Sequence, residues 1–562
     1  MVIDYVADAF VEVFRPGILF SMTLGTVAGI VAGAIPGFTI AMAVILTLPF
    51  TFGMSPIHGL STMLGVFVGG LSGGLISGTL LGIPGTPSSV ATTFDAFPMA
   101  RGGRPGLALG LGVWSSFFGG LLSWAALVFF APPLAAFGLK FGPWEFFSLI
   151  LFALTIIASL SGESLLKGCI SGLLGLFLAM VGDDEITGIE RYTFGYDELR
   201  QGFAFLPVLV GLFAFSQLMS DIETEEEARG SLLEAKAKGV RIDHWGAIKE
   251  IFRRPGNLLR SSFIGIFVGI LPAAGGSISN IVAYDQAKKA SRHPEKFGTG
   301  IPDGIIASEA ANNATAGGAL ITMMALGIPG DIVTAIMLGA LLIHNIIPSP
   351  AFITERPDLS YGIFVAFFLA HFIMIALQAV GLRLFLKVVH VPRYGLVSTI
   401  LLFCAVGIFA LSNVTFDVWT LFWFGLLGYA MRKFGFPLAP MIIGVVLGPI
   451  AEVNLNRSFM SNADPMLFLT RPISLFFVLL AVISLAFPFW QEQRDRPWAR
   501  FFFPACLLLM SLPFWLSPGW LKLIGVLFLL GGAYFIRRQW QGPPPAPGPE
   551  RAFDRPAKEA LD

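Results

Sequence analysis

The sequence predicts an all-α polytopic integral membrane protein. Of its 562 residues 55% are hydrophobic and 13% are charged, about half the charged share of a soluble domain, and the mean hydropathy is +0.77. Uncharged windows such as 106–137, 359–382 and 472–490 are long enough to span a bilayer. The pentapeptide LGIPG occurs twice in apolar surroundings, at Leu81–Gly85 and Leu326–Gly330. Gly and Pro break helices there, so broken transmembrane helices are expected.

The first element is a short amphipathic helix. Ile3, Val6, Phe10 and Val13 recur at helical spacing, with acidic residues between them. The segment has no basic region at its start, so it is not a signal peptide. We therefore expect a helix on the bilayer surface that leads into the first span after Pro16.

Three landmarks recur in the same order in the two halves of the chain. GAIP at Gly33–Pro36 resembles GILP 236 positions later, LGIPG recurs after 245 positions, and PVLVG at Pro207–Gly211 resembles PMIIG 233 positions later. Ordered landmarks with drifting offsets are expected of a duplication followed by loop changes. The sequence thus predicts two homologous repeats with broken helices or re-entrant hairpins. Inverted copies are the commoner solution in such transporters, but the span count leaves the orientation open.

The chain divides into five predicted parts. These are an N-terminal repeat with the leading surface helix at 1–220, a charged linker at 221–260, a C-terminal repeat at 261–455, additional transmembrane helices at 456–540 and a disordered tail at 541–562. Lys and Arg gather in the linker and near Arg432, Arg500 and Arg537. By the positive-inside rule the linker and the C-terminus are expected in the cytoplasm.

Composition disfavours several other classes of protein. The net charge is zero, which gives no electrostatic case for nucleic-acid binding. Cys169, Cys404 and Cys506 are scattered and form neither a disulfide framework nor a metal-binding spacing. The acidic stretch 182–185 has no nearby histidine and reads as a loop. No cofactor is expected.

The first candidate site segment lies just beyond the first LGIPG. Thr86, Ser88 and Ser89 follow the break, where a restarting helix would present free amide hydrogens and hydroxyls. The start of a helix favours a carboxylate, because the helix dipole is positive there. The alternative reading is ordinary helix packing through small residues.

The second candidate segment leads into the second LGIPG. Glu309, Asn312 and Asn313 fall within two helical turns, and Asp331 directly follows the break. Acidic and amide groups at membrane depth are costly and point to function. The alternative for Glu309 and the asparagines is the start of a helix at the membrane interface.

The two GxxP breaks form a third candidate segment. Unwound carbonyls at such breaks suit sodium, although a bare proline kink is the alternative. Together the segments give predicted substrate-binding residues Thr86, Ser88, Ser89, Gly275, Gly276, Ser277, Asn312 and Asn313. The predicted ion-binding residues are Gly82, Pro84, Gly85, Gly327, Pro329, Gly330 and Asp331.

These strings together resemble the large membrane subunit of the tripartite tricarboxylate transporters. The matching stretches include GAIPG, GTPSSVATTFDAFPMARGG, GILPAAGGSISNIVAY, PEKFGTG and EAANNATAGGAL, and the resemblance covers about residues 15–480. It departs at Gly82, where many relatives carry Asn, and in two further spans after Phe501.

The resemblance implies the permease subunit of a binding-protein-dependent secondary transporter in the bacterial inner membrane. It implies uptake of tri- or dicarboxylates by symport with Na⁺ or H⁺, a small four-span membrane partner and a periplasmic solute-binding protein. Two other classes stay open. A channel would show flux uncoupled from a cation gradient. An intramembrane enzyme would need a nucleophile–base pair or a metal motif, and neither HExxH nor paired aspartates occur in the spans.

Overall fold

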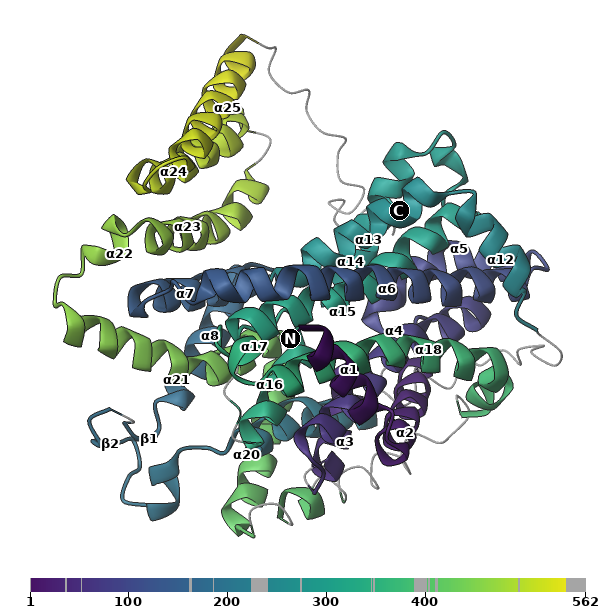
Figure 1. Ribbon diagram of the computed structural model, residues 1–562, viewed down its shortest axis with the longest axis horizontal. Helices are drawn as coiled ribbons and strands as arrows, with labels where there is room; N and C mark the ends of the chain where they lie inside the picture. The colour runs from purple at the N-terminus through teal and green to yellow at the C-terminus, as the bar shows by residue number, and fades with distance from the viewer. Residues whose placement is uncertain are drawn as a thin grey trace, which may run out of the picture. The chain divides into compact units, whose positions relative to one another are not determined.

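The computed structural model describes residues 2–35, 38–51, 53–160, 164–184, 186–223, 241–272, 275–344, 346, 349–388, 402, 405–409, 413–493 and 496–541. The described residues are overwhelmingly helical (Figure 1). The exception is an antiparallel hairpin of two short strands, β1 (Gly182–Asp183) and β2 (Glu190–Arg191). The predicted all-α class is confirmed.

Contacts divide the chain into two compact units. The first comprises Met1–Lys140 and Leu160–Ile450, and the second comprises Phe141–Ser159 and Ala451–Asp562. Each unit is described separately below. The predicted boundaries of the repeats, linker and added helices stay predictions.

The N-terminal half of the first unit contains both predicted breaks of the first copy. Its elements are α1 (Val2–Val13), α2 (Pro16–Ala34), α3 (Ile40–Thr51), α4 (Pro56–Leu81), η1 (Pro87–Ser89), α5 (Val90–Arg101), α6 (Pro105–Gly138), α8 (Leu165–Ala179), η2 (Asp197–Gln201), α9 (Phe205–Leu209), the π-helical η3 (Val210–Phe215) and α10 (Ser216–Glu223). The predicted N-terminal helix is present as α1, and its Ala9 and Val13 are buried.

The C-terminal half of the first unit repeats this pattern of long helices with breaks. Its elements are α12 (His244–Phe252), α13 (Pro255–Ile270), α14 (Gly275–Ala290), η4 (Pro294–Lys296), α15 (Pro302–Leu326), α16 (Ile332–Ile343), α17 (Phe352–Glu355), α18 (Pro357–Val388), α20 (Thr415–Lys433) and the first part of α21 (Leu438–Ser461). Residues 224–240 of the linker and 542–562 of the tail lie outside the described residues.

Proline sets the start of many of these helices. Pro16, Pro56, Pro105, Pro255 and Pro302 each occupy the first helical position of a long helix. Proline is favoured there because its φ angle is already helical and its missing N–H would have no intrahelical partner. The sequence thus encodes the start of each of these helices locally.

Helices of membrane-spanning length run through both units. Among the described residues, the helices long and apolar enough to cross a bilayer are Pro16–Ala34, Pro56–Leu81, Pro105–Gly138, Pro357–Gly381, Leu438–Ser461, Pro472–Gln491 and Trp498–Leu516. Shorter apolar helices such as α3 and α16 accompany them. The chain is a multi-pass membrane protein.

Glycines let α2 pack on α4 and α13 pack on α15 at close range. A Cβ atom added at Gly29 would lie 2.2 Å from the carbonyl oxygen of Val66, and one at Gly265 would lie 2.3 Å from that of Ala311. The two glycines are 236 positions apart and their partners 245 apart, which are the offsets of the sequence landmarks. A second pair keeps these offsets: Gly33 with Gly70, and Gly269 with Thr315. The contacts favour a duplication, whose orientation stays a prediction.

The helix α15 forms the centre of the first unit. It packs against α6, α13, α14 and α5 (Figure 1). All of its residues from Gly304 to Ala325 are buried, including the polar ones. A helix that is buried on every side carries no amphipathic pattern, so polar residues on it lie inside the protein.

The second unit consists of short and long apolar helices. They are α7 (Pro143–Leu160), α22 (Leu467–Thr470), α23 (Pro472–Glu492), η5 (Pro497–Phe501), α24 (Phe502–Leu516) and α25 (Leu521–Gln541). Arg471 joins α7 to the start of α23: its Nε donates to Glu145 at 2.5 Å and its guanidinium stacks over Trp144. The two helices predicted after Phe501 are present as α24 and α25, which pack on each other.

A buried carboxylate on α5 holds a loop of the other half of the chain. Oδ1 of Asp95 accepts the backbone N–H groups of Gly298, Gly300 and Ile301 at 2.8–3.0 Å, and Oδ2 accepts the hydroxyl of Tyr284 at 2.9 Å. Asp95 is completely buried. The partners belong to α14 and to the loop that carries the PEKFGTG string, so this contact ties α5 to the second half.

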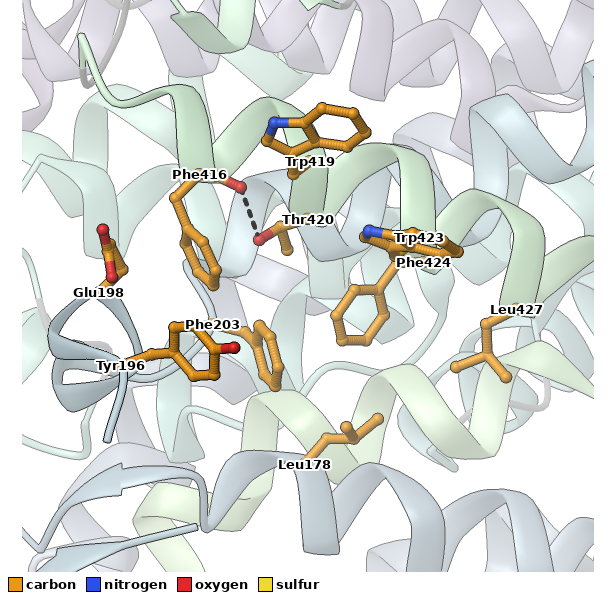
Figure 2. A pocket seen from close by; sticks show the side chains of 10 residues that line it. All are labelled: Leu178, Tyr196, Glu198, Phe203, Phe416, Trp419, Thr420, Trp423, Phe424 and Leu427. Carbon is orange, nitrogen blue, oxygen red and sulfur yellow. Dashed lines mark hydrogen bonds between the residues drawn. The ribbon is translucent and has the colours of Figure 1, made fainter. Parts of the chain in front are cut away.

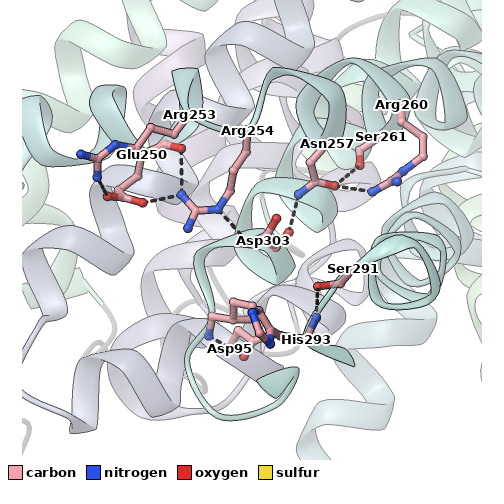
Figure 3. A network of polar contacts seen from close by, with 11 residues as sticks. Asp95, Glu250, Arg253, Arg254, Asn257, Arg260, Ser261, Ser291, His293 and Asp303 are labelled. Atoms are coloured by element: carbon pink, nitrogen blue, oxygen red, sulfur yellow. Dashed lines mark hydrogen bonds and ion pairs between the residues drawn. The ribbon is translucent and has the colours of Figure 1, made fainter. Parts of the chain in front are cut away.

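Next to this loop, an ion-pair network joins α12, α13 and α15 (Figure 3). Nε of Arg254 donates to Asp303 at 2.7 Å, and the same guanidinium pairs with Glu250. The hydrogen bond from Arg254 to the carboxylate of Glu250 is the main reason that the pKa of Glu250 is lowered. Asn257 adds a hydrogen bond of 2.9 Å to the backbone oxygen of Asp303. The last part of the predicted linker is therefore fixed to the start of α15.

Replacing Asp95 with Ala should lower the stability of the folded protein by about 3 kcal/mol or more. The change removes the charged acceptor of three backbone N–H groups, and a hydrogen bond to a charged group is worth about 1.5–3 kcal/mol. Asp95→Asn should be milder, because its amide oxygen still accepts those bonds and Tyr284 can accept one from the amide. Thermal unfolding in detergent measures both. The exposed Asp285, paired only with Lys289, provides the control Asp285→Ala. An Asp95→Ala protein with the same melting temperature as the wild type would contradict this role.

Candidate functional site

The first LGIPG ends α4 and starts a new helix as predicted. Gly82 closes α4 in the left-handed conformation, with φ +74°. Thr86 and Ser89 then form a capping box at η1, which continues into α5. The left-handed position explains the departure at Gly82, because Asn is the residue that most often replaces Gly in that conformation.

The second LGIPG has the same local structure. Gly327 closes α15 with φ +71°, and Asp331 caps α16. Oδ1 of Asp331 accepts the N–H and the hydroxyl of Thr334, each at 2.7 Å. Asp331 and Thr334 lie 245 positions after Thr86 and Ser89, so each break ends in a capping box at the corresponding place. Asp331 therefore has a structural role as a helix cap. Its binding of an ion stays a prediction.

In each half, the last glycine of LGIPG touches the GxxP break. A Cβ atom added at Gly85 would lie 2.0 Å from the carbonyl oxygen of Gly33, and one at Gly330 would lie 2.2 Å from that of Gly269. Both α2 and α13 end there in extended backbone, at Ile35 and at a residue 236 positions later. The two kinds of break thus meet within each half. Pro36 lies outside the described residues.

The two halves meet at the start of α14. A Cβ atom added at Gly276 would lie 2.6 Å from Oδ1 of Asn312 and 2.9 Å from Cβ of Ser88. One added at Gly275 would lie 3.7 Å from Cβ of Asp331. Gly275 therefore lies near Asp331, which follows the second LGIPG, and Gly276 lies near Ser88, which follows the first. Residues just after both broken segments thus lie near the start of α14.

Three buried asparagines, Asn280, Asn312 and Asn313, have their amide groups hydrogen-bonded and their oxygens unpaired. The amide of Asn312 donates to the backbone oxygen of Leu71 at 3.0 Å, and that of Asn280 donates to the backbone oxygen of Ser88. No described residue donates to Oδ1 of any of the three asparagines, and all three side chains are fully buried. Because Leu71 fixes the amide of Asn312, its oxygen is directed at Gly276. A buried, unpaired acceptor calls for a partner such as a water molecule, an ion or a bound group.

The structure brings together most of the predicted substrate-binding residues. Thr86, Ser88, Ser89, Gly275, Gly276 and Asn312 gather around the start of α14. Ser277 is exposed, and Asn313 donates to the backbone oxygen of Glu309 on its own helix at 3.3 Å. The predicted ion-binding residues Gly82, Pro84, Gly85, Gly327, Pro329 and Gly330 all lie in the breaks, and their binding of an ion stays a prediction.

Asn280 is not among the substrate-binding residues predicted from the sequence. It lies four residues after Gly276, so the two share one face of α14. That spacing was visible in the sequence and is the signal that could have found it. The analysis also gave no partners for Glu309, which the structure places between Thr92 and Ser116. Those contacts bridge about 200 positions, and no local pattern predicts them.

A separate cavity of about 540 Å³ is lined almost entirely by aromatic and aliphatic side chains (Figure 2). Phe203, Phe416 and Trp419 belong to this lining, together with Glu198 and Thr420. No basic side chain and none of the predicted site residues lines it. The cavity is therefore a mainly apolar space, separate from the predicted site residues.

Comparison with known proteins identifies the family. Residues 19–443 match the family described as tripartite tricarboxylate transporter TctA. Two similar proteins come from Agrobacterium vitis. An uncharacterized 52.8 kDa protein of the TAR-I ttuC' 3' region is 36% identical over 479 residues, which are 84% of this chain and 93% of that protein. An uncharacterized protein of the TAR-II ttuC' 3' region is 32% identical over 236 residues, 41% of this chain and 98% of its own length.

No solved structure matches the chain. The family match nevertheless covers both breaks, the start of α14 and the whole of α15. The chain therefore belongs to the tripartite tricarboxylate transporter TctA family, the large membrane component of such transporters.

Proposed function

We propose that this chain is the permease subunit of a secondary transporter that imports tri- or dicarboxylates by symport with Na⁺ or H⁺. Its substrate site is the cluster of Ser88, Gly276 and Asn312. The observation that carries this proposal is their convergence at one point from η1, α14 and α15, which belong to both halves of the chain. A site between two halves is where rocking of one half against the other would alternate access.

The start of α14 supplies the attraction for a carboxylate. The first N–H groups of a helix have no intrahelical partners, and the helix dipole adds about half a positive charge there. At the start of α14 they lie beside Ser88, whose hydroxyl is a further donor. The glycine at 276 lets Ser88 and Asn312 approach the backbone closely, because no side chain covers it.

The unpaired oxygen of Asn312 serves a different part of the substrate. It is an acceptor, so it would bind a hydroxyl or a protonated carboxyl of the ligand rather than a carboxylate. A hydroxylated or partly protonated polycarboxylate offers both kinds of group. This combination favours polycarboxylates over simple anions.

The other subunits follow from the family. We infer that a small four-span membrane protein and a periplasmic solute-binding protein complete the transporter, and that most of the substrate selectivity resides in the latter. We place the chain in the bacterial inner membrane, with the linker and the C-terminus in the cytoplasm. The Lys and Arg residues of the linker support this orientation.

Uptake by the reconstituted complex tests the function. Proteoliposomes with this chain, its small membrane subunit and its binding protein should accumulate labelled citrate or succinate when an inward Na⁺ or proton gradient is imposed. Accumulation should disappear when the gradient is removed at matched membrane potential. Equal uptake with and without the gradient would favour a channel, and chemical conversion of the label would favour an enzyme.

A further inference from the structure

A completely buried carboxylate lies one helical turn before Asn312. Oε1 of Glu309 accepts the hydroxyl of Thr92 on α5 at 2.6 Å, and Oε2 accepts that of Ser116 on α6 at 2.8 Å. Its side chain has no exposed area. On the basis of the proposed transport function, we propose that Glu309 carries the coupling proton, binding it on the outside and releasing it on the inside.

The partners of Glu309 differ in kind from those of the other buried carboxylate, Asp95. Three backbone N–H groups hold Asp95, and an N–H group can only donate. Three N–H donors on one oxygen favour the ionised form of that site. Glu309 is held by two hydroxyls, which can donate or accept. By rotating a hydroxyl, its site can hold the ionised carboxylate or the protonated acid without moving a heavy atom.

No positive charge is paired with Glu309. Among the described residues, no nitrogen of Lys, Arg or His lies within 4.0 Å of its carboxylate oxygens, whereas Glu250 and Glu145 both have arginine partners. A buried, unpaired charge is costly, so the site is stable only when the charge is removed or balanced. A proton removes it at each transport cycle.

Several other titratable groups lie on the elements packed against α15. The helix α6, which supplies Ser116, carries none, and neither does α16. On α5, Asp95 is held by the loop at 298–301, and Tyr284 on α14 donates to Asp95. The remaining titratable side chains on the elements packed against α15 are His58 on α4, Arg101 on α5, Arg260 on α13, Asp285, Lys288 and Lys289 on α14, and Glu355 on α17.

His371 is another buried titratable side chain near Glu309. It contacts α6 at Gly120, one turn beyond Ser116. Its Nε2 is directed at Gly120, and its Nδ1 lies 2.7 Å from the backbone oxygen of Phe367. Among the described residues, His371 forms no hydrogen bond with Glu309 or Ser116. We therefore assign the proton to Glu309 and not to the imidazole.

The proton step balances simply. On the outward-facing side, a proton from water forms an O–H bond with one oxygen of Glu309, and the neutral acid then donates to a hydroxyl. On the inward-facing side, that O–H bond breaks and the proton leaves to water. One positive charge thus enters with the substrate and offsets one of its carboxylates. Glu309 and Asn312 are one helical turn apart, so binding of the proton at Glu309 and binding of the substrate at Asn312 can influence each other.

Glu309→Gln tests the proposal, because Gln has the shape of the protonated acid and cannot release a proton. A gradient of one pH unit is a tenfold ratio of proton activity, so one coupled proton raises wild-type accumulation of labelled citrate by up to about tenfold. Glu309→Gln should lose that increase. It should keep the exchange of internal for external citrate, which needs no net proton movement. Asp285→Asn, which removes an exposed charge on neighbouring α14, should behave as the wild type.

Full proton-driven accumulation by a folded Glu309→Gln protein would overturn the proposal. Loss of both citrate exchange and citrate accumulation in that protein would overturn it as well. Should Glu309→Gln not fold, Ser116→Ala decides. Removing a donor to the carboxylate favours the protonated form, so the pH of half-maximal uptake should move upward. An unmoved pH profile would overturn the proposal. Failure of the wild type to take up any carboxylate would instead refute the proposed function itself.

Discussion

Replacing Asn312 with Ala should reduce carboxylate uptake by about tenfold to a hundredfold while the protein still folds. The change removes the buried oxygen that is directed at Gly276 and the amide bonded to Leu71. The bound hydroxyl or acid would lose its acceptor, and a buried donor left unpaired costs about 1–3 kcal/mol, which corresponds to about that range of affinity. Uptake of labelled citrate by proteoliposomes, normalised to folded protein, measures the effect.

The neighbouring Asn313 provides the matched control. Its oxygen is buried and unpaired like that of Asn312, but only the oxygen of Asn312 is directed at Gly276, so Asn313→Ala should keep most of the uptake. The sequence treats the two residues alike, and the structure separates them. A fully active Asn312→Ala protein would remove α15 from the substrate site, and equal loss in both variants would point to a packing role for the whole turn.

Gly85→Ala and Gly330→Ala should each prevent the protein from folding normally. The added methyl group would lie 2.0 Å or 2.2 Å from a backbone oxygen of the neighbouring break. Backbone cannot rotate away as a side chain can, so the broken segment must move as a whole. Overpacking in a dense interior costs about 1–3 kcal/mol and sometimes more, and this contact lies at the upper end. The yield of monodisperse protein in detergent and its melting temperature measure the loss.

The control for both variants is Gly256→Ala. No atom lies within 4 Å of a Cβ added at Gly256, which occupies the first turn of α13. That change should leave the yield unaltered, since Ala is the better helix former by at most about 1 kcal/mol. Wild-type yields for Gly85→Ala and Gly330→Ala would show that the breaks do not pack as closely as described. Because the two glycines occupy corresponding places, the two variants should behave alike.

The sequence by itself determined the membrane class and the position of the breaks. Uncharged windows fix where the spans are, because charge is excluded from hydrocarbon. Proline at Pro16, Pro56 or Pro105 fixes where helices begin, and Gly82 and Gly327 fix where they end. These are local effects of the backbone, so each can be read from a few adjacent residues. The family also follows from such strings.

Only the tertiary structure decided which polar groups meet. Ser88 and Gly276 are 188 positions apart, and Thr92 and Glu309 are 217 apart. Their contacts depend on the register in which η1, α5, α14 and α15 pack, and periodicity does not specify that register when a helix is buried on every side. The hydrophobic pattern that places a residue inside the protein is the same for Asn312 as for Asn313. The direction of each side chain, and hence the site, comes from the close contacts that the small residues permit.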